Sequence, residues 1–275
     1  MILAAAALLI VIVLIFALVK LLSPSNAEVS ASTSLISEQS SSQTTDSEQA
    51  LTELSSSQTD SSDTDSDFSH EALPDSYLID GFDIIYQEPE LPTGCEITAL
   101  TMAINYYGFD VDKVTMAEDY LPCEEYNVYT GSDGLLYGND LNEVFVGDPA
   151  GTGYICGTGA IITAANSYFA DQGSELKAVD KTGITFDELY GYVSEGAPVV
   201  VWVTIGMEDR REAEGWYTTD GEWVDWSTND HGAVLIGYSE DTVTIADPIS
   251  GIIEYDRAQF ESVFESRGNQ CVIIE

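Results

Sequence analysis

The part of this chain that is expected to fold contains one histidine, His231. The sequence has only one other, His70, which lies in a tract rich in serine and aspartate. Cys95 precedes His231 along the chain, and Asp247 follows it by sixteen residues. In that order, a cysteine can supply a thiolate that attacks a carbonyl, a histidine can carry the proton, and a carboxylate can orient the imidazole ring. The three residues therefore predict hydrolysis through a covalent thiol intermediate.

Cys95 is expected in the first turn of a helix. Thr93 and Glu96, three residues apart, fit a capping box, and apolar residues follow at helical spacing as far as Tyr107. Gly108 then supplies a stop. Unpaired backbone N–H groups and the positive end of the helix dipole stabilise a thiolate at such a position. The alternative is a buried structural cysteine, although the preceding Pro-Thr-Gly is typical of a turn.

His231 and Asp247 are expected on two paired strands. The runs 231–238 and 243–246 are apolar and rich in β-branched residues, and a turn is predicted near residue 240. Such a hairpin brings positions 231 and 247 opposite each other, where Asp247 would hold the ring through its Nδ1–H. The alternatives are a core histidine that begins a strand and an aspartate that forms a turn before a proline.

Gln87 lies eight residues before Cys95 and is a candidate oxyanion donor. Its side-chain amide can donate to the negative oxygen that forms when the thiolate attacks, together with the backbone N–H of Cys95. A surface glutamine at the end of a strand fits the same spacing. The predicted catalytic residues are therefore Cys95, His231, Asp247 and Gln87.

No metal or cofactor is expected. The sequence has no histidine pair and no Cys-x-x-Cys motif for zinc, and it has no phosphate loop or dinucleotide fingerprint. Asp133, Asn139 and Asp140 lie in one glycine-rich stretch. They lack the spacing of an EF-hand loop, which favours a solvated loop over a calcium site.

The order of the predicted elements indicates an α+β fold with leading helices packed on an antiparallel sheet. A strand over 79–86 and the helix from Cys95 precede an irregular stretch from 109 to 157. Residues 216–226 are typical of a hairpin turning at 220–221, whose tryptophans would line a substrate cleft or pack on the sheet. Further helices are expected over 159–170, 185–196 (beginning with a second capping box at Thr185) and 257–265, and further strands over 198–205 and 270–274.

The composition is strongly acidic. Eight basic residues stand against 48 acidic ones, which gives a net charge of −40. Such a chain repels nucleic acid and anionic lipid headgroups, so neither is an expected partner. The charge suits solubility outside the cell, and it would also attract a cationic peptide substrate. The four cysteines are too few for a disulfide scaffold; Cys123 and Cys156 either form a bridge or are two buried thiols.

Three segments are expected along the chain. Residues 2–19 are continuously apolar, so 1–22 is predicted to be a transmembrane anchor, or else a signal sequence cleaved near Ala27. Residues 23–72 are rich in serine, threonine and acids, which predicts a disordered linker. Residues 73–275 are the predicted folded domain. This domain is expected outside the cytoplasm, tethered to the cell membrane or secreted.

With these residues the chain resembles the family 39-like cysteine peptidases, relatives of the peptidases that remove double-glycine leaders from bacteriocin precursors. The resemblance runs from about residue 79 to the carboxyl end. It implies a papain-like fold in which Cys95 is the nucleophile, His231 the base, Asp247 its orienting group and Gln87 the oxyanion donor. The matching region includes no transporter membrane domain and no ATPase cassette, so leader removal is not implied. The resemblance is carried by Gln87, LPTGCE at 91–96, GDP at 147–149, PVVVWVTIGM at 198–207, NDHGAVLIGY at 229–238 and DPISG at 247–251.

The sequence therefore predicts an extracytoplasmic thiol peptidase that acts on a peptide or protein substrate. Two alternatives fit the same residues. One is a non-catalytic cell-surface binding module on the same fold, and the other is a cell-wall amidase or endopeptidase that uses the same nucleophile on another bond. Selective alkylation of Cys95 favours an enzyme, whereas slow and uniform labelling of all cysteines favours a binding module.

Overall fold

The computed structural model describes residues 73–275. The predicted anchor, 1–22, and the predicted linker, 23–72, lie outside the described residues. No helix between residues 73 and 275 is long and apolar enough to cross a membrane. The described chain combines helices with antiparallel strands, which agrees with the predicted α+β class.

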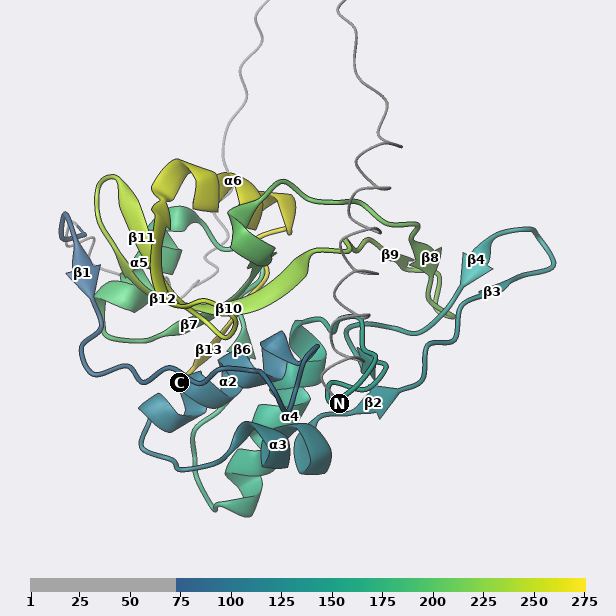
Figure 1. Ribbon diagram of the computed structural model, residues 1–275, viewed down its shortest axis with the longest axis horizontal. Helices are drawn as coiled ribbons and strands as arrows, with labels where there is room; N and C mark the ends of the chain where they lie inside the picture. Colours follow the sequence, from purple (N-terminus) through teal and green to yellow (C-terminus); the bar gives the residue numbers. More distant parts are fainter. Residues whose placement is uncertain (1–72) are drawn as a thin grey trace, which may run out of the picture. The chain divides into compact units, whose positions relative to one another are not determined.

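An antiparallel sheet of seven strands forms the centre of the fold (Figure 1). Its strands, in spatial order, are β12 (Gly251–Asp256), β11 (Thr242–Asp247), β10 (Asp230–Tyr238), β7 (Val199–Thr204), β13 (Cys271–Ile274) and β6 (Ala178–Asp180), and β1 (Tyr77–Leu78) pairs with β10. β7 and β10 are the central pair, and nearly all of their residues are buried. Apolar, β-branched runs suit such strands because the sheet is covered on both faces.

Helices cover both faces of this sheet. They are α2 (Cys95–Tyr106), α3 (Lys113–Thr115, continued by a π-helical turn at Met116–Tyr120), α4 (Thr158–Asp171), α5 (Phe186–Ser194) and α6 (Arg257–Ser266). Figure 1 shows α2 and α4 on one side of the sheet and α6 on the other. α5 joins α6 through a hydrogen bond of 3.0 Å from Tyr190 Oη to Glu261 Oε1.

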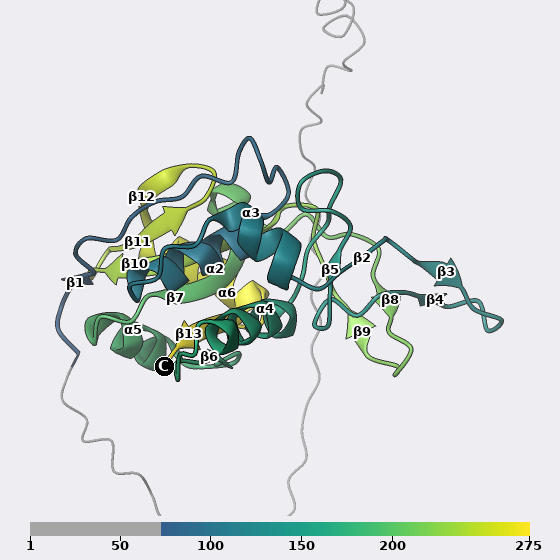
Figure 2. The same ribbon diagram turned by 90° about the horizontal axis from the view of Figure 1, so that it is seen from below.

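A smaller sheet projects from one end of the main sheet (Figures 1 and 2). Its strands, in spatial order, are β3 (Tyr129–Thr130), β4 (Leu136–Tyr137), β8 (Trp216–Tyr217) and β9 (Trp223–Val224). We call this small sheet the lobe. The lobe is built from the two long connections that precede α4 and β10. The first of these connections also forms a parallel pair, β2 (Cys123–Glu124) with β5 (Phe145–Val146).

Most of the predicted elements are present within a few residues of their expected bounds. The long apolar runs became β7, β10, β11 and β13, and the helices predicted after residue 150 became α4, α5 and α6. The capping box at Thr185 is confirmed, since its Oγ1 accepts from the backbone N–H of Glu188 and the Glu188 carboxylate accepts from the backbone N–H of Thr185. The predicted hairpin over 216–226 is confirmed as β8 and β9.

Two local predictions are wrong. Residues 79–86 form no strand; Gly81, with φ of 71°, turns the chain away from the sheet just after β1. The capping box at Thr93 is not formed, because Gly94 is the N-cap residue of α2. The Thr93 hydroxyl instead donates to the backbone oxygen of Asp148 at 3.1 Å. Strands β6 and β12 were also not predicted: β6 has only three residues, and the partial alternation of apolar and acidic residues in β12 is a strand signal that was overlooked.

Helix α2 packs tightly against the sheet at Gly232 on β10. A Cβ atom at this position would lie 2.7 Å from Cα of Glu96 and 3.0 Å from its backbone nitrogen. Real Cβ atoms do not approach backbone atoms this closely, so a larger residue would force α2 and β10 apart. Gly232 directly follows His231, and Glu96 directly follows Cys95. The contact therefore sets the separation of the two predicted catalytic elements.

Gly232→Ala is expected to destabilise the protein by about 1–3 kcal/mol, because the new methyl group meets backbone rather than a flexible side chain. Denaturant unfolding followed by circular dichroism measures this difference. Gly191→Ala is the matched control: Gly191 lies inside α5, its Cβ would have no neighbour closer than 4.0 Å, and alanine favours a helix. The control should be neutral or stabilising, and equal losses in the two variants would contradict the tight contact at Gly232.

Candidate active site

Cys95 is the first residue of α2 and its side chain is buried. Its Sγ donates a hydrogen bond to Oε2 of Glu96 at 3.2 Å. The backbone N–H of Gly232 also faces the sulfur atom. The nucleophile candidate therefore lies at the seam between α2 and β10, with the first turn of the helix on one side and the start of the strand on the other.

The thiol of Cys95 is protonated in this arrangement. Burial raises the pKa of Cys95 well above the ordinary value of a thiol, and the nearby Glu96 carboxyl raises it further through its charge and its hydrogen bond. The backbone N–H groups of Gly232 and Glu96 lower the pKa but do not offset burial. The helix start was predicted to hold a thiolate; the position is as predicted, but burial outweighs the helix terminus in the free protein.

Glu96 is a functional candidate, although the sequence pattern indicates it only as a capping residue. Its side chain is buried, and burial raises the pKa of Glu96 from 4.5 to about 7. Hydrogen bonding to Cys95 and the charge of His231 oppose that rise. A signal was available, since Glu96 is the one charged residue in the run from Cys95 to Tyr106. A lone acid in a buried helix turn needs a local partner, and here that partner is the thiol.

His231 and Asp247 form a buried pair. Nε2 of His231 lies 3.1 Å from Oδ1 of Asp247, and the two side chains are 1% and 4% exposed. The ring was predicted to use its Nδ1–H for this bond, but the structure uses Nε2. Nδ1 is buried and has no hydrogen-bond partner among residues 73–275. The ring therefore keeps one nitrogen for a reacting group, which is the arrangement that a general base needs.

The register of β10 and β11 differs slightly from the predicted hairpin. Val234 pairs with Ala246, which places Asp247 beside Ala233 and two residues from the position opposite His231. A shift of two residues leaves both side chains on the same face of the sheet. Without the irregularity between Leu235 and Gly237, the pairing would place Asp247 opposite Val234, on the other face of the sheet from His231. The predicted partnership therefore survives although the predicted pairing is wrong by two residues.

The carboxylate of Asp247 is held in place by several donors. Its Oδ1 accepts from the backbone N–H groups of Ile249 at 2.7 Å and Ser250 at 3.0 Å as well as from His231. Burial raises the pKa of Asp247, but the histidine and these two N–H groups outweigh burial, so that the net pKa is lowered. Asp247 therefore stays ionised at neutral pH and can stabilise a protonated His231.

Gln87 lies next to the same turn. Its backbone N–H donates to the oxygen of Pro248 at 2.8 Å, which ties the segment before α2 to the residue after Asp247. The side chain is buried, and Nε2 donates to the oxygen of Pro92 at 2.8 Å. An amide nitrogen carries two N–H groups, so one remains for an oxyanion. Gln87 thus lies in the segment that leads directly into Cys95.

Lys113 holds this segment and was not found from the sequence. Its buried ammonium group donates to the backbone oxygens of Tyr86 and Gln87, the latter at 2.7 Å, and pairs with Glu90 Oε2 at 2.8 Å. A lysine at the start of a short helix gives no sequence signal for such a role. Lys113 is a positioning residue, because it fixes the backbone on which Gln87 stands.

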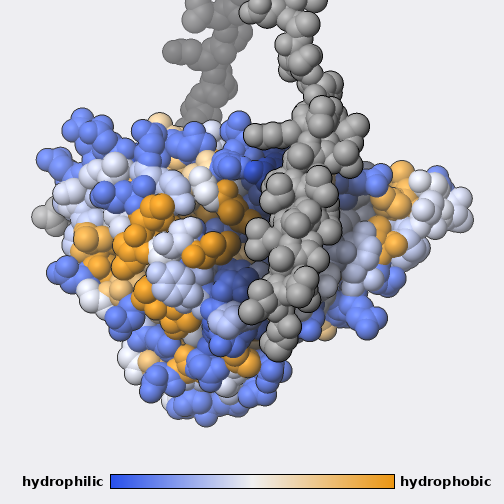
Figure 3. Space-filling model, in the orientation of Figure 1, coloured by the Kyte–Doolittle hydropathy of each residue, from blue (hydrophilic) through white to orange (hydrophobic). Residues whose placement is uncertain are grey.

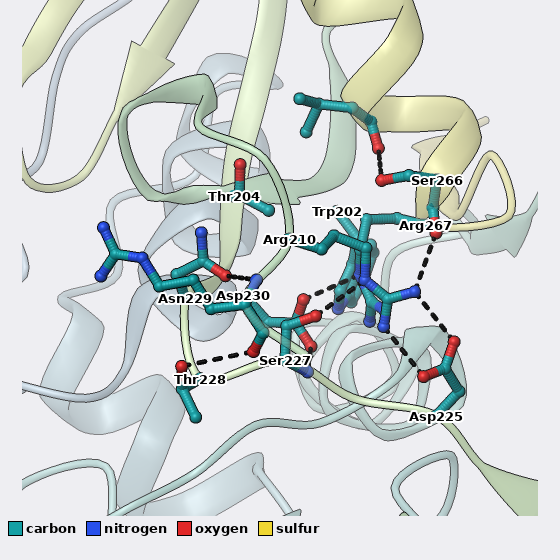
Figure 4. A network of polar contacts seen from close by, with 12 residues as sticks. Trp202, Thr204, Arg210, Asp225, Ser227, Thr228, Asn229, Asp230, Ser266 and Arg267 are labelled. Carbon is teal, nitrogen blue, oxygen red and sulfur yellow. Dashed lines mark hydrogen bonds and ion pairs between the residues drawn. The ribbon is translucent and has the colours of Figure 1, made fainter. Parts of the chain in front are cut away.

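A second network fixes the chain just before His231 (Figure 4). Arg267 of the segment after α6 forms a buried ion pair with Asp230, with Nε 2.9 Å from Oδ1. Arg210 pairs with Asp225 at 2.9 and 3.0 Å and donates to Ser227 Oγ at 2.7 Å. These bonds hold the connection that enters β10, so His231 stands at the end of an anchored loop.

The structure thus brings Cys95, His231, Asp247 and Gln87 to one region, through the contact of α2 with β10 and the bond between Gln87 and Pro248. Within the described residues no hydrogen bond joins Cys95 to His231, because the thiol donates to Glu96 instead.

The remaining cysteines and the acidic residues of the glycine-rich stretch lie as follows. All four cysteines are free; Cys156 is buried and Cys123 is exposed, so the bridge between them is absent and only one of the two is a buried thiol. No group of three or more His, Cys, Asp or Glu side chains that could hold a metal ion occurs in the part of the chain that the structure describes. Asp133 accepts from Leu135 N and from the hydroxyl of Tyr137, as expected for a loop residue.

Known proteins resemble this chain in sequence and in fold. Protein YvpB of Bacillus subtilis (strain 168), itself uncharacterized, is 32% identical over 197 residues, which is 70% of this chain and 74% of that protein. A crystal structure from Bacillus anthracis described as a C39-like peptidase is 30% identical, covers 74% of this chain and 98% of that one, and superposes with a TM-score of 0.63. The model of the peptidase C39-like family matches residues 79–272. The chain therefore belongs to the peptidase C39-like family.

Proposed function

We propose that this protein is an extracytoplasmic thiol peptidase that hydrolyses peptide bonds through Cys95, His231 and Asp247. The observation that supports this most strongly is the buried bond between His231 Nε2 and Asp247, which leaves Nδ1 without a partner at the strand end that contacts the start of α2. A histidine that serves only the core satisfies both of its ring nitrogens. The location outside the cytoplasm rests on the apolar segment 2–19.

In the proposed reaction the thiol first leaves Glu96 and turns toward His231. Nδ1 takes the thiol proton, and the ionised Asp247 stabilises the imidazolium that results. The thiolate then attacks the carbonyl carbon of the scissile bond. The oxyanion accepts hydrogen bonds from the backbone N–H of Cys95 and the free amide N–H of Gln87. The imidazolium gives its proton to the leaving amine, and water hydrolyses the thioester by the reverse sequence.

A non-catalytic binding module on the same fold is the second candidate. The specific observation in its favour is the buried thiol, which is protonated and bonded to Glu96 rather than to His231. In the peptidase this is the resting state, from which substrate binding releases the thiol. In a binding module it is the permanent state. The two candidates differ in whether Cys95 reacts with a carbonyl substrate.

Cys95→Ala is expected to reduce hydrolysis of an unstructured protein such as casein by several orders of magnitude, because no other nucleophile replaces the thiol. His231→Ala should be nearly as damaging, and Asp247→Asn intermediate, because an amide still positions the ring but stabilises the imidazolium poorly. Release of labelled peptides measures the rates. Cys271→Ala is the control, since Cys271 is also a buried free thiol but lies on β13.

This control should keep turnover within about threefold of the wild type, because the substitution removes only a sulfhydryl group from a strand outside the site. Each variant is first compared with the wild type by thermal unfolding, so that a rate change is separated from unfolding. Wild-type turnover in Cys95→Ala would contradict the peptidase. Equal losses in Cys95→Ala and Cys271→Ala, matched by equal losses of stability, would also contradict it.

Glu96→Gln is expected to speed alkylation of Cys95 by iodoacetamide about 3- to 10-fold at pH 8.5, because the carboxylate that raises the thiol pKa is replaced by a neutral amide. At pH 5.5 the difference should largely disappear, since Glu96, with a pKa of about 7, is then mostly protonated and uncharged. Mass spectrometry of the Cys95 peptide gives both rates. Slower labelling of Glu96→Gln at pH 8.5 would show that the carboxylate assists the thiol rather than restraining it.

A further inference from the structure

Four aromatic residues form a continuous row across the lobe, one from each strand. Tyr129 pairs with Tyr137, Tyr137 with Tyr217, and Tyr217 with Trp223. Neighbouring ring centroids lie 6.1, 6.2 and 4.9 Å apart. Because paired residues in a sheet point to the same face, the four rings stand on one side of the lobe. We call this row the aromatic ladder.

The ladder is the outer face of the lobe. On the opposite face, Trp216 and Val224 pair with each other and are buried, at 1% and 8% exposed. On the ladder, Trp223 is 55% and Tyr129 is 49% exposed. Figure 3 also shows patches of strongly hydrophobic surface on this projecting part of the molecule. Leu135 is an aliphatic residue of the lobe that is 47% exposed. Large aromatic side chains usually stabilise a hydrophobic core. These four lie on the open face of a small sheet whose strands are two residues long, so they do not have that role.

Two glycines let the rings lie across the strands. A Cβ atom at Gly131 would meet the ring of Tyr137 at 2.8 Å, and one at Gly215 would meet the indole of Trp223 at 2.5 Å. Tyr137 and Trp223 therefore cover the backbone of Gly131 and Gly215 with one ring face. The other face of the exposed Trp223 ring is turned away from the sheet, where it can stack on a ligand.

The surroundings of the ladder are predominantly acidic, although Arg210 pairs with Asp225. The two segments that build the lobe, 123–140 and 212–226, contain nine acidic residues and no basic residue. A cavity of about 390 Å³ adjoins the end of the ladder, and Trp223 is part of its wall. Asp140, Asp180, Glu222 and Asp225 also line it. The arginine of this cavity, Arg267, is already paired with Asp230.

We propose that the aromatic ladder and the adjoining acidic cavity bind a basic segment of a polypeptide, rich in arginine. The planar guanidinium group stacks on aromatic faces and donates to carboxylates at the same time, and this lobe offers both. A neutral polymer would use the rings but gain nothing from the excess of acidic side chains, and an acidic polymer would be repelled. The site lies outside the catalytic residues, so binding is independent of whether Cys95 reacts.

The test measures binding to the full-length Cys95→Ala protein by fluorescence anisotropy. The probe is a labelled ten-residue peptide of alternating arginine and glycine, and peptides with glutamine or glutamate in place of arginine have the same length. The arginine peptide should bind at least tenfold more tightly than the glutamine peptide, and the glutamate peptide should not bind. Equal affinity for the arginine and glutamine peptides would overturn the proposal.

The net charge of the whole protein attracts any basic peptide, so the decisive variants keep the charge unchanged. Tyr217→Ala combined with Trp223→Ala should weaken binding about tenfold, since each ring contributes a cation–π contact. Tyr217→Phe combined with Trp223→Phe keeps both rings and should retain most of the wild-type affinity. This variant separates loss of the rings from local unfolding of the lobe. Ile252→Ala is the control, because Ile252 is 54% exposed but lies on β12.

Unchanged affinity in the double variant would assign the binding to diffuse charge and overturn the proposal. So would equal losses in the double variant and in Ile252→Ala. Chitohexaose is a further arm of the titration, because exposed aromatic rings also stack on sugars. Displacement of the arginine peptide by chitohexaose at lower concentration than by unlabelled peptide would assign the ladder to a glycan and overturn the proposal.

Discussion

The close contact between β10 and the first turn of α2 is the constraint on which the site depends. Gly232 permits it, because its missing side chain lets Glu96 backbone atoms occupy the space of a Cβ. The residues that precede this contact on each element are His231 and Cys95. Packing of two backbones, rather than a bond between the two side chains, therefore sets the positions of the proposed base and the proposed nucleophile. The apolar strands β7 and β10 make this packing rigid, since they are buried at the centre of the sheet.

The ionisable groups of this site differ in how easily they lose a proton. Asp247 is kept ionised by three donors on one oxygen, whereas burial makes Glu96 hard to ionise and Cys95 harder still. In the free protein Cys95 is therefore a neutral thiol bonded to Glu96, and His231 Nδ1 has no hydrogen-bond partner among the described residues. For the proposed peptidase this means that reactivity depends on what enters the site, since a substrate must displace one hydrogen bond before the thiol can meet the imidazole.

The sequence predicted those parts of the fold that follow from local periodicity. The runs that became β7, β10 and α4 were long, apolar and bounded by turn residues, and one face of each had to be buried. The pairing of His231 with Asp247 also followed, because a shift of two residues keeps a side chain on its face. The features of the site that the sequence did not predict depend on tertiary contacts. The use of Nε2, the burial of Glu96 and the hold of Lys113 on the Gln87 segment arise from neighbours distant in sequence, and no local pattern encodes them.

In the proposed peptidase, Cys95 attacks a carbonyl carbon and His231 acts as its base. Mixing the wild-type protein with a p-nitrophenyl ester of an acylated amino acid, followed by acid quenching and peptide mapping, tests this directly. We expect a thioester on Cys95, formed with release of one p-nitrophenolate per protein. We also expect that His231→Ala slows acylation by several orders of magnitude. The other three cysteines should stay unmodified. No acyl group on Cys95, or acylation at the same rate in His231→Ala, would contradict it.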